Sequence, residues 1–560
     1  MRELRIPVLL KDREVEGETD PEGRWAPYEV RRVRVESLLD GPVSDRVAVV
    51  DVRADGSLAP AVPRPSSDAE LLPQTAEPYR EPAIIRWSVF AIVLETLALF
   101  ESPDCLGRVI PWAFGHPQLL VVPEAGEEPN AFYDRSSCSL QFYYFQGGQS
   151  GKRIDAAASH DIVAHETAHA VLDGIAPWLY ASATVQAVAI HESIADLTAL
   201  FAATFSRSLA SRALVLTAGN LAATGLFSSL AAEFGRGLGE KNGLRTLVDE
   251  DPGKPLALSA FGPGGRASEP HDVSVVLSRA FYALLMDAYD ARLLRPPARA
   301  NSQAHTLHFD GAPGRSGLPA QHAALRFAVG LVKRLLFRGL DYLPPADVGF
   351  LDLARAVLAC DRAAHPEDTT HVRDLLVVRL LERGVGATAA DLDTPFQLVR
   401  AAVGVVRLDA IMASTWHAMR LVEAHRAVLG IPPGVPFDVL PRVRVQKVLI
   451  RPTERPVRDE VLLKIAWRER DPVRAGPAGP LWTRHGATVA FDCASGEVCA
   501  WLRTDSLAQA EDPGVSVSGL HPARAIGAGR SGRVAKLPDA PAGVDATAFR
   551  ELWGTLMGRG

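Results

Sequence analysis

The sequence predicts an α+β protein, because helix-like and strand-like segments occupy separate stretches of the chain. Apolar residues recur at helical spacing from Ile84 to Phe100 and again after His271. Short runs of β-branched and aromatic residues lie at 119–122 and 140–145, before the central helices, and at 443–450, after them. We therefore expect a β-rich part, a helical part and a further sheet near the C-terminus.

Four regions are expected along the chain. Residues 1–78 carry short strand-like runs and a proline-rich linker, which predicts a small β-rich domain. Packing against the neighbouring domain is its simpler role, and docking or gating of a substrate is the alternative. Residues 79–290 contain the motifs described below, 291–430 combine a polar loop insertion with helices, and 431–560 form a C-terminal α+β domain. We find no internal repeats.

The composition is that of an ordinary folded protein of several domains. The chain has 560 residues, of which 47% are hydrophobic and 22% charged. A formal net charge of −6 does not favour nucleic acid or an anionic membrane as a partner, so we expect neither. The five cysteines are odd in number and too few for a disulfide framework. A bridge between Cys493 and Cys499 is conceivable, but reduced thiols are the simpler expectation.

The sequence favours a cytoplasmic protein. The apolar run before Lys11 is too short for the core of a signal peptide. The longest uncharged run, 213–232, contains several Gly, Ser, Thr and Asn residues and is more typical of a buried helical hairpin than of a membrane span. His305 and His308 form an H-x-x-H pair in the polar insertion, where such histidines can bind metal but are more often exposed.

The segment around residue 165 has the pattern H-E-x-x-H. His165 and His169 are four residues apart, so on a helix they leave the same face about 40° from one another and can share one metal ion. Glu166 projects toward the open side of that ion, where its carboxylate can take a proton from a bound water. The pattern therefore predicts two metal ligands and a general base.

A third ligand is expected from the following segment. Glu192 and Asp196 are one helical turn apart, so one can bind the metal while the other supports a ligand imidazole. Two histidines and one carboxylate leave a tetrahedral zinc with one position for water. Each part also has an ordinary alternative, because single histidines are mostly structural and acidic pairs are mostly solvated.

Together these motifs resemble the thermolysin-like, or gluzincin, zinc metallopeptidases, whose third ligand is a glutamate on the next helix. The resemblance implies one zinc per chain, held by His165, His169 and Glu192, with Asp196 supporting a ligand from outside. Upstream, the segment 129–133 looks like the edge strand of that family, which implies that Asn130 and Ala131 hold the substrate backbone.

Three further residues are implied by the same resemblance. Arg245, in the segment 243–246, is similar to the arginine that meets the substrate carbonyl. His271, in the segment 270–274, is similar to the histidine that stabilises the transition state. Tyr180 lies twelve residues before Glu192 and corresponds in place to the oxyanion tyrosine, although the gap is three residues longer here.

The chain departs from the family pattern in two places. The carboxylate that partners the transition-state histidine is replaced by Arg266, so Glu269 or Asp272 would have to partner His271. The family residue at Asp161 also helps to bind structural calcium, but no acidic cluster follows the third ligand here. We therefore interpret Asp161 as a charge in the first turn of a helix that Ser159 caps and Gly174 ends, and we expect no calcium.

The resemblance covers residues 85–290 well and the helices up to about 385 weakly. It implies a β-rich N-terminal lobe and an α-helical C-terminal lobe with zinc between them. The implied function is that of a zinc-dependent metalloendopeptidase acting on a peptide or protein. The acidic segment with which related aminopeptidases bind a free amine is absent, so an endopeptidase is preferred. A catalytically silent zinc-binding scaffold and a processing protease for one partner are the alternatives, and the oligomeric state is open.

Overall fold

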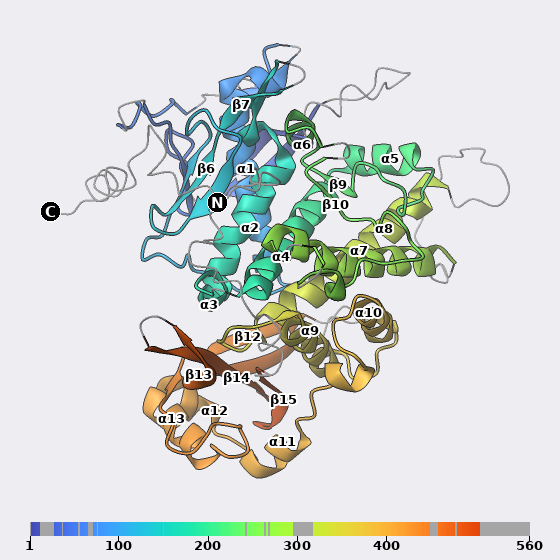
Figure 1. The fold of residues 1–560 in the computed structure, drawn as a ribbon. Helices are drawn as coiled ribbons and strands as arrows, with labels where there is room; N and C mark the ends of the chain where they lie inside the picture. Colours follow the sequence, from blue (N-terminus) through green and yellow to red (C-terminus); the bar gives the residue numbers. More distant parts are fainter. Residues whose placement is uncertain are drawn as a thin grey trace.

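The fold class is α+β, as predicted, and Figure 1 shows a β-rich part, a helical centre and a C-terminal sheet. The computed structural model describes residues 2–11, 27–35, 37–53, 57–64, 71–75, 77–148, 151–182, 184–240, 243–262, 265–266, 269–294, 317–448, 457–476 and 479–504. His305 and His308 lie outside these residues, so the H-x-x-H pair stays a prediction.

The β-rich part contains a mixed sheet whose edge strand lies beside the central helices. Three strands are parallel and the edge strand β5 is antiparallel to its neighbour β6. In spatial order the strands are β3 (Val47–Val49), β4 (Leu119–Val122), β6 (Ser139–Phe142) and β5 (Ala131–Asp134). Two antiparallel ribbons flank the sheet: β1 (Arg2–Leu9) with β2 (Tyr28–Val35), and β7 (Tyr144–Gln146) with β8 (Arg153–Asp155). The run expected over 140–145 is thus divided between β6 and β7.

Helices form the centre of the molecule, and α2 and α4 carry the predicted metal residues. The helices are α1 (Pro82–Glu101), α2 (His160–Ile175), α3 (Pro177–Tyr180), α4 (Val185–Ala203), α5 (Arg207–Leu216), α6 (Ala232–Gly237), α7 (Pro270–Leu294), α8 (Leu318–Leu340), α9 (Phe350–Ala364) and α10 (Val372–Leu381). The helical hairpin expected over 213–232 was wrong. Ala218 and Gly219 adopt positive φ angles directly after α5, which end the helix, and a short ribbon of β9 (Ser229–Leu230) with β10 (Arg245–Thr246) follows.

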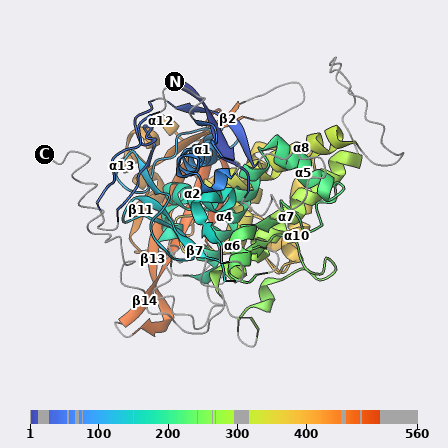
Figure 2. The ribbon, with the colours of Figure 1, turned by 90° about the horizontal axis from the view of Figure 1, so that it is seen from above.

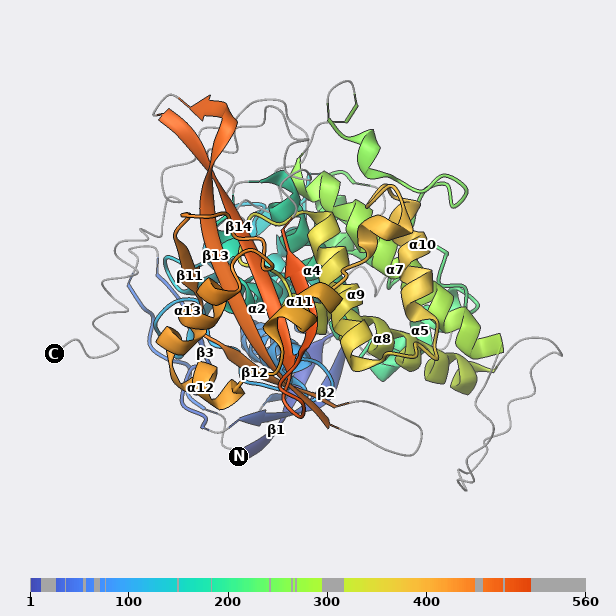
Figure 3. The same cartoon turned by 90° about the horizontal axis from the view of Figure 1, so that it is seen from below.

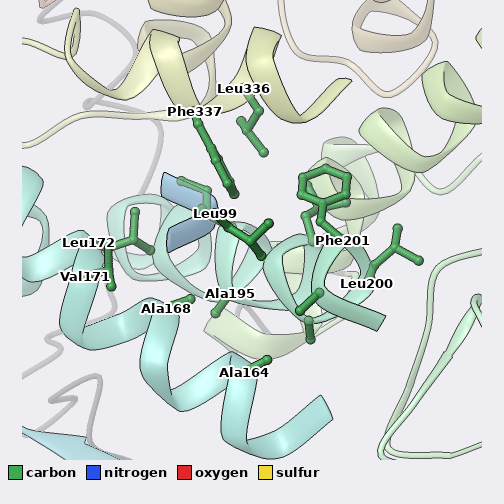
Figure 4. Close-up of a cluster of buried hydrophobic side chains, with 14 of the residues drawn as sticks. Leu99, Ala164, Ala168, Val171, Leu172, Ala195, Leu200, Phe201, Leu336 and Phe337 are labelled. Atoms are coloured by element: carbon green, nitrogen blue, oxygen red, sulfur yellow. The ribbon is translucent and has the colours of Figure 1, made fainter. Parts of the chain in front are cut away.

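Small residues let α2 and α4 pack closely in front of larger side chains. Figure 4 shows Ala164 and Ala168 of α2 near Ala195 of α4, with Phe201 and Phe337 above them in this view. The ring of Phe337 packs edge-on against that of Phe201, with centroids 5.7 Å apart. Because such interiors are close-packed, the two helices have a fixed relative position.

Helix α2 begins after Ser159, as predicted, but the details of both ends differ from the expectation. The Ser159 hydroxyl makes no capping hydrogen bond. Gly174 does not end the helix, which continues to Ile175. A Cβ atom on Gly174 would lie 2.0 Å from the carbonyl oxygen of Pro111, so the glycine permits a close backbone approach.

Asp161 lies in the first turn of α2, as expected, and it also has a partner that the sequence did not reveal. The Lys11 ammonium donates to Asp161 Oδ2 at 2.5 Å and to the Ser229 carbonyl at 2.8 Å. The Ala231 backbone N–H donates to the same Asp161 oxygen at 3.1 Å. Both charged side chains are buried, so an internal cation joins the N-terminal strand, α2 and the β9 ribbon.

The C-terminal part is an antiparallel sheet covered on one face by short helices. Figures 2 and 3 show β13 and β14 projecting from the body of the protein. The strands are β11 (Phe437–Val439), β12 (Val443–Val448), β13 (Val457–Gly476), β14 (Gly479–Asp492) and β15 (Val498–Arg503), and the helices are α11 (Gln397–Val403), α12 (Leu408–Ala413) and α13 (Thr415–Ala424). All five cysteines are free thiols.

Two large hydrophobic cores, with two smaller clusters beside them, hold the described residues together. The first extends from Leu4 to Leu392 and also takes in one face of the C-terminal sheet. The second lies between the other face of that sheet and the covering helices. The N-terminal strands therefore share a core with the metal helices, and the division into four domains stays a prediction.

Two helices, α1 and α4, are long and apolar enough to cross a membrane by length and composition. Within the protein, 67% of the apolar window of α1 and 94% of that of α4 are buried. Such burial is typical of core helices, whose apolar residues face protein on all sides.

Candidate metal centre

The predicted ligands of α2 and α4 converge in the interior of the protein. His165, Glu166 and His169 are buried on one side of α2, and they can each offer a ligand atom within 4.8 Å of the others. Glu192 reaches the same point from α4. The helical spacing thus brings together the residues that the sequence predicts.

The distances between the side chains of three of these residues fit one shared metal ion. His165 Nε2 lies 3.1 Å from His169 Nε2 and 3.3 Å from Glu192 Oε2, and His169 Nε2 lies 3.5 Å from Glu192 Oε1. Two ligand atoms bound at about 2 Å to a tetrahedral zinc are about 3.3 Å apart. The two imidazole nitrogens and the carboxylate therefore have the chemistry and the spacing of a site that could hold a metal ion.

Asp196 and Arg245 support these ligands from behind. Asp196 Oδ1 lies 3.0 Å from His165 Nδ1, so it can accept the proton of that nitrogen and leave Nε2 free to bind metal. Arg245 donates to the same Asp196 oxygen at 2.5 Å and approaches Glu192 Oε2 at 3.5 Å. The structure thus places Arg245 beside the ligands, and its guanidinium balances two buried carboxylates.

His191 is a part of the centre that the sequence reasoning missed. Its Nδ1 lies 2.6 Å from His169 Nδ1. Burial lowers the pKa of His191 to about 4, so the ring is neutral and its Nδ1 can accept a hydrogen bond from the Nδ1–H of His169. His191 directly precedes Glu192 in the sequence and lies about 100° from it around α4. This adjacency to a predicted ligand was the available clue that His191 lies near the centre.

Glu166 is held between the metal ligands and the edge strand. The backbone N–H of Tyr133 in β5 donates to Glu166 Oε2 at 3.1 Å. Burial raises the pKa of Glu166 to about 8, and a divalent cation beside it would lower that pKa. A carboxyl group whose pKa is brought close to neutral pH by these two opposing effects can both accept and release a proton.

The outer side of β5 presents backbone groups next to Glu166. The carbonyl of Asn130 accepts a hydrogen bond from Tyr143 on the inner side, so the N–H of Ala131 points outward, as does that of Tyr133. Asn130 Oδ1 is buried without a hydrogen-bond partner among the described residues. An extended peptide could satisfy these groups by pairing with the edge.

His271 approaches the centre from the first turn of α7. Its Nε2 lies 3.3 Å from Glu192 Oε2, and its Nδ1 lies 2.7 Å from Glu269 Oε1. Burial lowers the pKa of His271, but Glu192 and Glu269 outweigh this effect and raise it. Of the two carboxylates that could partner His271, Glu269 does so, while the backbone N–H of Asp272 donates to the other Glu269 oxygen at 3.1 Å.

Tyr180 lies one layer away, against residues that surround the ligands. Its ring packs edge-on against His191, with centroids 6.1 Å apart, and under the guanidinium of Arg135 at 4.4 Å. Arg135 is in turn held by Asp173, which also accepts the Tyr133 hydroxyl proton at 2.8 Å. The role of Tyr180 toward an oxyanion stays a prediction.

A comparison of the chain with models of known protein families found no match, and a comparison with curated proteins found none either. The resemblance to thermolysin-like peptidases therefore depends on the motif residues alone. Their geometry supports a buried metal site, and the identity of the ion belongs to the proposal that follows.

Proposed function

We propose that the chain is a zinc-dependent endopeptidase. The convergence of His165 Nε2, His169 Nε2 and the Glu192 carboxylate, with Glu166 beside them, supports this proposal above all. Zinc, when bound, supplies a Lewis acid that lowers the pKa of a water and polarises a carbonyl group. A purely structural site has no need of a base next to the ligands.

Different residues of the chain carry out the steps of hydrolysis. Glu166 accepts a proton from the attacking water while the oxygen of that water forms a bond to the scissile carbonyl carbon. Glu166 then returns that proton to the leaving nitrogen as the C–N bond breaks. His271, oriented by Glu269, donates a hydrogen bond to the negative charge that develops on the carbonyl oxygen.

The edge strand β5 supports a peptide as the substrate. The outward N–H of Ala131 and the unpartnered Asn130 Oδ1 would pair with an extended backbone, whatever its side chains. The Tyr133 N–H on the same edge holds Glu166, so one strand positions both the substrate and the base.

The substitution Glu166→Gln tests the proposal. It keeps the shape of the side chain but removes the base, so zinc content and stability should stay close to wild type. Cleavage of a proteome-derived peptide library, read by mass spectrometry, should fall roughly a hundred- to ten-thousand-fold.

Glu77→Gln is a matched control, because Glu77 is 55% exposed and pairs only with Arg80 among the described residues. This variant should cleave like the wild type. Equal cleavage by Glu166→Gln and the wild type would refute the assigned base. No cleavage by the wild type would favour a scaffold or a protease for a single partner.

A further inference from the structure

A second candidate binding site lies in a cavity of about 760 Å³ between α8 and the C-terminal half of α9. The segment that leads from α9 to α10 closes one side of it. Figure 3 shows α8, α9 and α10 as neighbours beside the C-terminal sheet. None of the residues that line this cavity belongs to the candidate metal centre.

The α8 wall of the cavity carries a row of arginines. Arg326, Arg334 and Arg338 all line the cavity, and Gly330 lies between them at the same four-residue spacing. With no side chain at Gly330, the guanidinium of Arg334 lies close to the helix, 3.1 Å from the position of a Cβ atom there. Positive charge is therefore concentrated along one stripe of the wall.

Of the two inner arginines, Arg338 is buried and Arg334 is half-buried, and both are incompletely paired with carboxylates among the described residues. Arg338 is 5% exposed and donates to the carbonyls of Cys105 and Val448, which carry no charge. The nearest described carboxylate to Arg334 is that of Asp104, at 3.7 Å, and Lys333 shares it at 3.5 Å. Two cations thus share the Asp104 carboxylate, and Arg338 adds a third positive charge next to Arg334. Burial lowers the pKa of Arg334, which Asp104 raises and Arg338 lowers further.

Two of the three acidic residues of the opposite wall, Asp361 and Asp368, have other partners, and the third, Glu367, is exposed to solvent. Asp361 pairs with Arg373 at 2.8 Å and lies 2.9 Å from His365 Nδ1. Asp368 accepts hydrogen bonds from the first backbone N–H groups of α10, those of Val372 and Arg373. The inner end of the cavity therefore keeps a net positive charge.

The rest of the lining is mainly apolar. Phe327, Leu331 and Leu335 come from α8, and Ala364 and Val372 come from the opposite wall. A cavity of this size with an apolar lining and a few placed charges is typical of a small-molecule site. The positive charge at one end and the apolar surface beyond it favour a ligand that has a negative group and an apolar part.

We propose that this cavity binds an organic anion, with its carboxylate or phosphate head at Arg334 and Arg338 and an apolar body against Phe327, Leu331 and Leu335. The head supplies a counter-charge to Arg338, which donates to carbonyls, and to Arg334, which shares its one carboxylate with Lys333. The body displaces water from the apolar wall. The site is independent of the metal centre and of its proposed reaction.

Calorimetric titration of the full, metal-loaded chain tests the site, with octanoate as the probe. Octanoate should bind at least tenfold more tightly than octyltrimethylammonium, which has the same body and the opposite charge. It should also bind at least tenfold more tightly than inorganic phosphate, which has no apolar body. Octyl phosphate, compared with octanoate, identifies the preferred head group.

Arg334→Met keeps the apolar stem and removes the charge, so it should weaken octanoate binding at least tenfold. Arg420→Met, at an exposed position of α13, should leave binding unchanged. Ala364→Leu narrows the cavity without changing its charge and should also weaken binding. Octanoate affinity equal to wild type in either cavity variant would overturn the proposal, as would equal affinity for octanoate and octyltrimethylammonium.

Discussion

Two buried polar clusters of this protein differ in how their atoms are paired. In the metal cluster, defined as His165, His169 and Glu192, two nitrogens and a carboxylate face one another at 3.1 to 3.5 Å. In the lysine cluster, defined as Lys447, Glu460 and Tyr342, an ammonium donates to the carboxylate at 2.6 Å and to the hydroxyl at 3.0 Å. The Tyr342 hydroxyl completes the triangle by donating to Glu460 at 2.5 Å.

The difference separates a site that could hold a cation from a site that already contains one. The lysine cluster contains its own cation, so its charges balance inside the protein. In the metal cluster, Arg245 approaches Glu192 at 3.5 Å from outside, but the lone pairs of the two imidazoles and the carboxylate converge on a common point where an added cation could bind. Burial alone therefore does not mark a functional site, whereas converging acceptor atoms do.

The largest effect should follow from removing one ligand of the metal cluster. His169→Ala should lower the zinc content from about one equivalent per chain to almost none, and hydrolysis should be lost with it, because two protein ligands hold zinc poorly. Elemental analysis after dialysis measures the content. His417→Ala, on the exposed face of α13, is the control and should keep its zinc. Full occupancy in His169→Ala would show that the ligands are wrongly assigned.

Breaking the lysine cluster should instead reduce stability. Lys447→Met leaves the Glu460 carboxylate buried next to a neutral side chain, which should lower the free energy of unfolding by about 3–5 kcal/mol. Zinc content should not change. Denaturant unfolding gives the free energy, and the double variant Lys447→Met, Glu460→Met should recover most of the loss. A similar loss in both variants would mean that packing, and not charge, matters at this position.

A second buried lysine of the C-terminal sheet, Lys464, has no paired carboxylate among the described residues, and this should make the stability of the protein depend on pH. Lys464 is buried, donates to the Leu343 carbonyl at 3.0 Å and lies over the ring of Trp178. Burial lowers its pKa to about 7, with Asp341 raising it and Arg108 lowering it. The unfolded chain therefore binds more protons than the folded chain above pH 7, and stability rises with pH up to the unfolded pKa.

From pH 7 to pH 9 this lysine should add about 2 kcal/mol to the free energy of unfolding. Lys464→Met should lack that increment, which is measured as the difference between the variant and the wild type at each pH. A pH dependence shared by both proteins would exclude Lys464 as its source.

The smallest expected effect is that of a calcium-selective chelator, which should leave the melting temperature unchanged. The family pattern implies calcium binding by Asp161, but here the Asp161 carboxylate forms an ion pair with the Lys11 ammonium. A strong zinc chelator should abolish hydrolysis in the same preparation. A fall of many degrees with the calcium chelator alone would contradict this prediction.

The sequence predicts those parts of the metal centre that depend on spacing within one helix. The histidines of α2, four residues apart, and the acidic pair of α4 follow from the period of the α-helix. The strand after Asn130 is found at a sheet edge, as the resemblance of the segment 129–133 to the family's edge strand implied. Such local patterns are visible without knowledge of the fold.

Contacts between distant segments were not predictable in the same way. Nothing near Asp161 in the sequence indicates that Lys11 will reach it, and His169 gains His191 through the packing of two helices. Gly174 looks like the end of a helix, yet it is required by the backbone of Pro111. In each case the partner is chosen by tertiary packing, which outweighs local preference.

The Lys11–Asp161 pair also implies an order in which parts of the chain can reach their folded positions during synthesis. Lys11 leaves the ribosome first, and its partners Asp161 and Ser229 follow 150 and 218 residues later. Because a domain folds as a unit once its segments are available, the N-terminal strand waits for both of them. Helix α2 therefore reaches its final environment only after translation has passed the β9 ribbon.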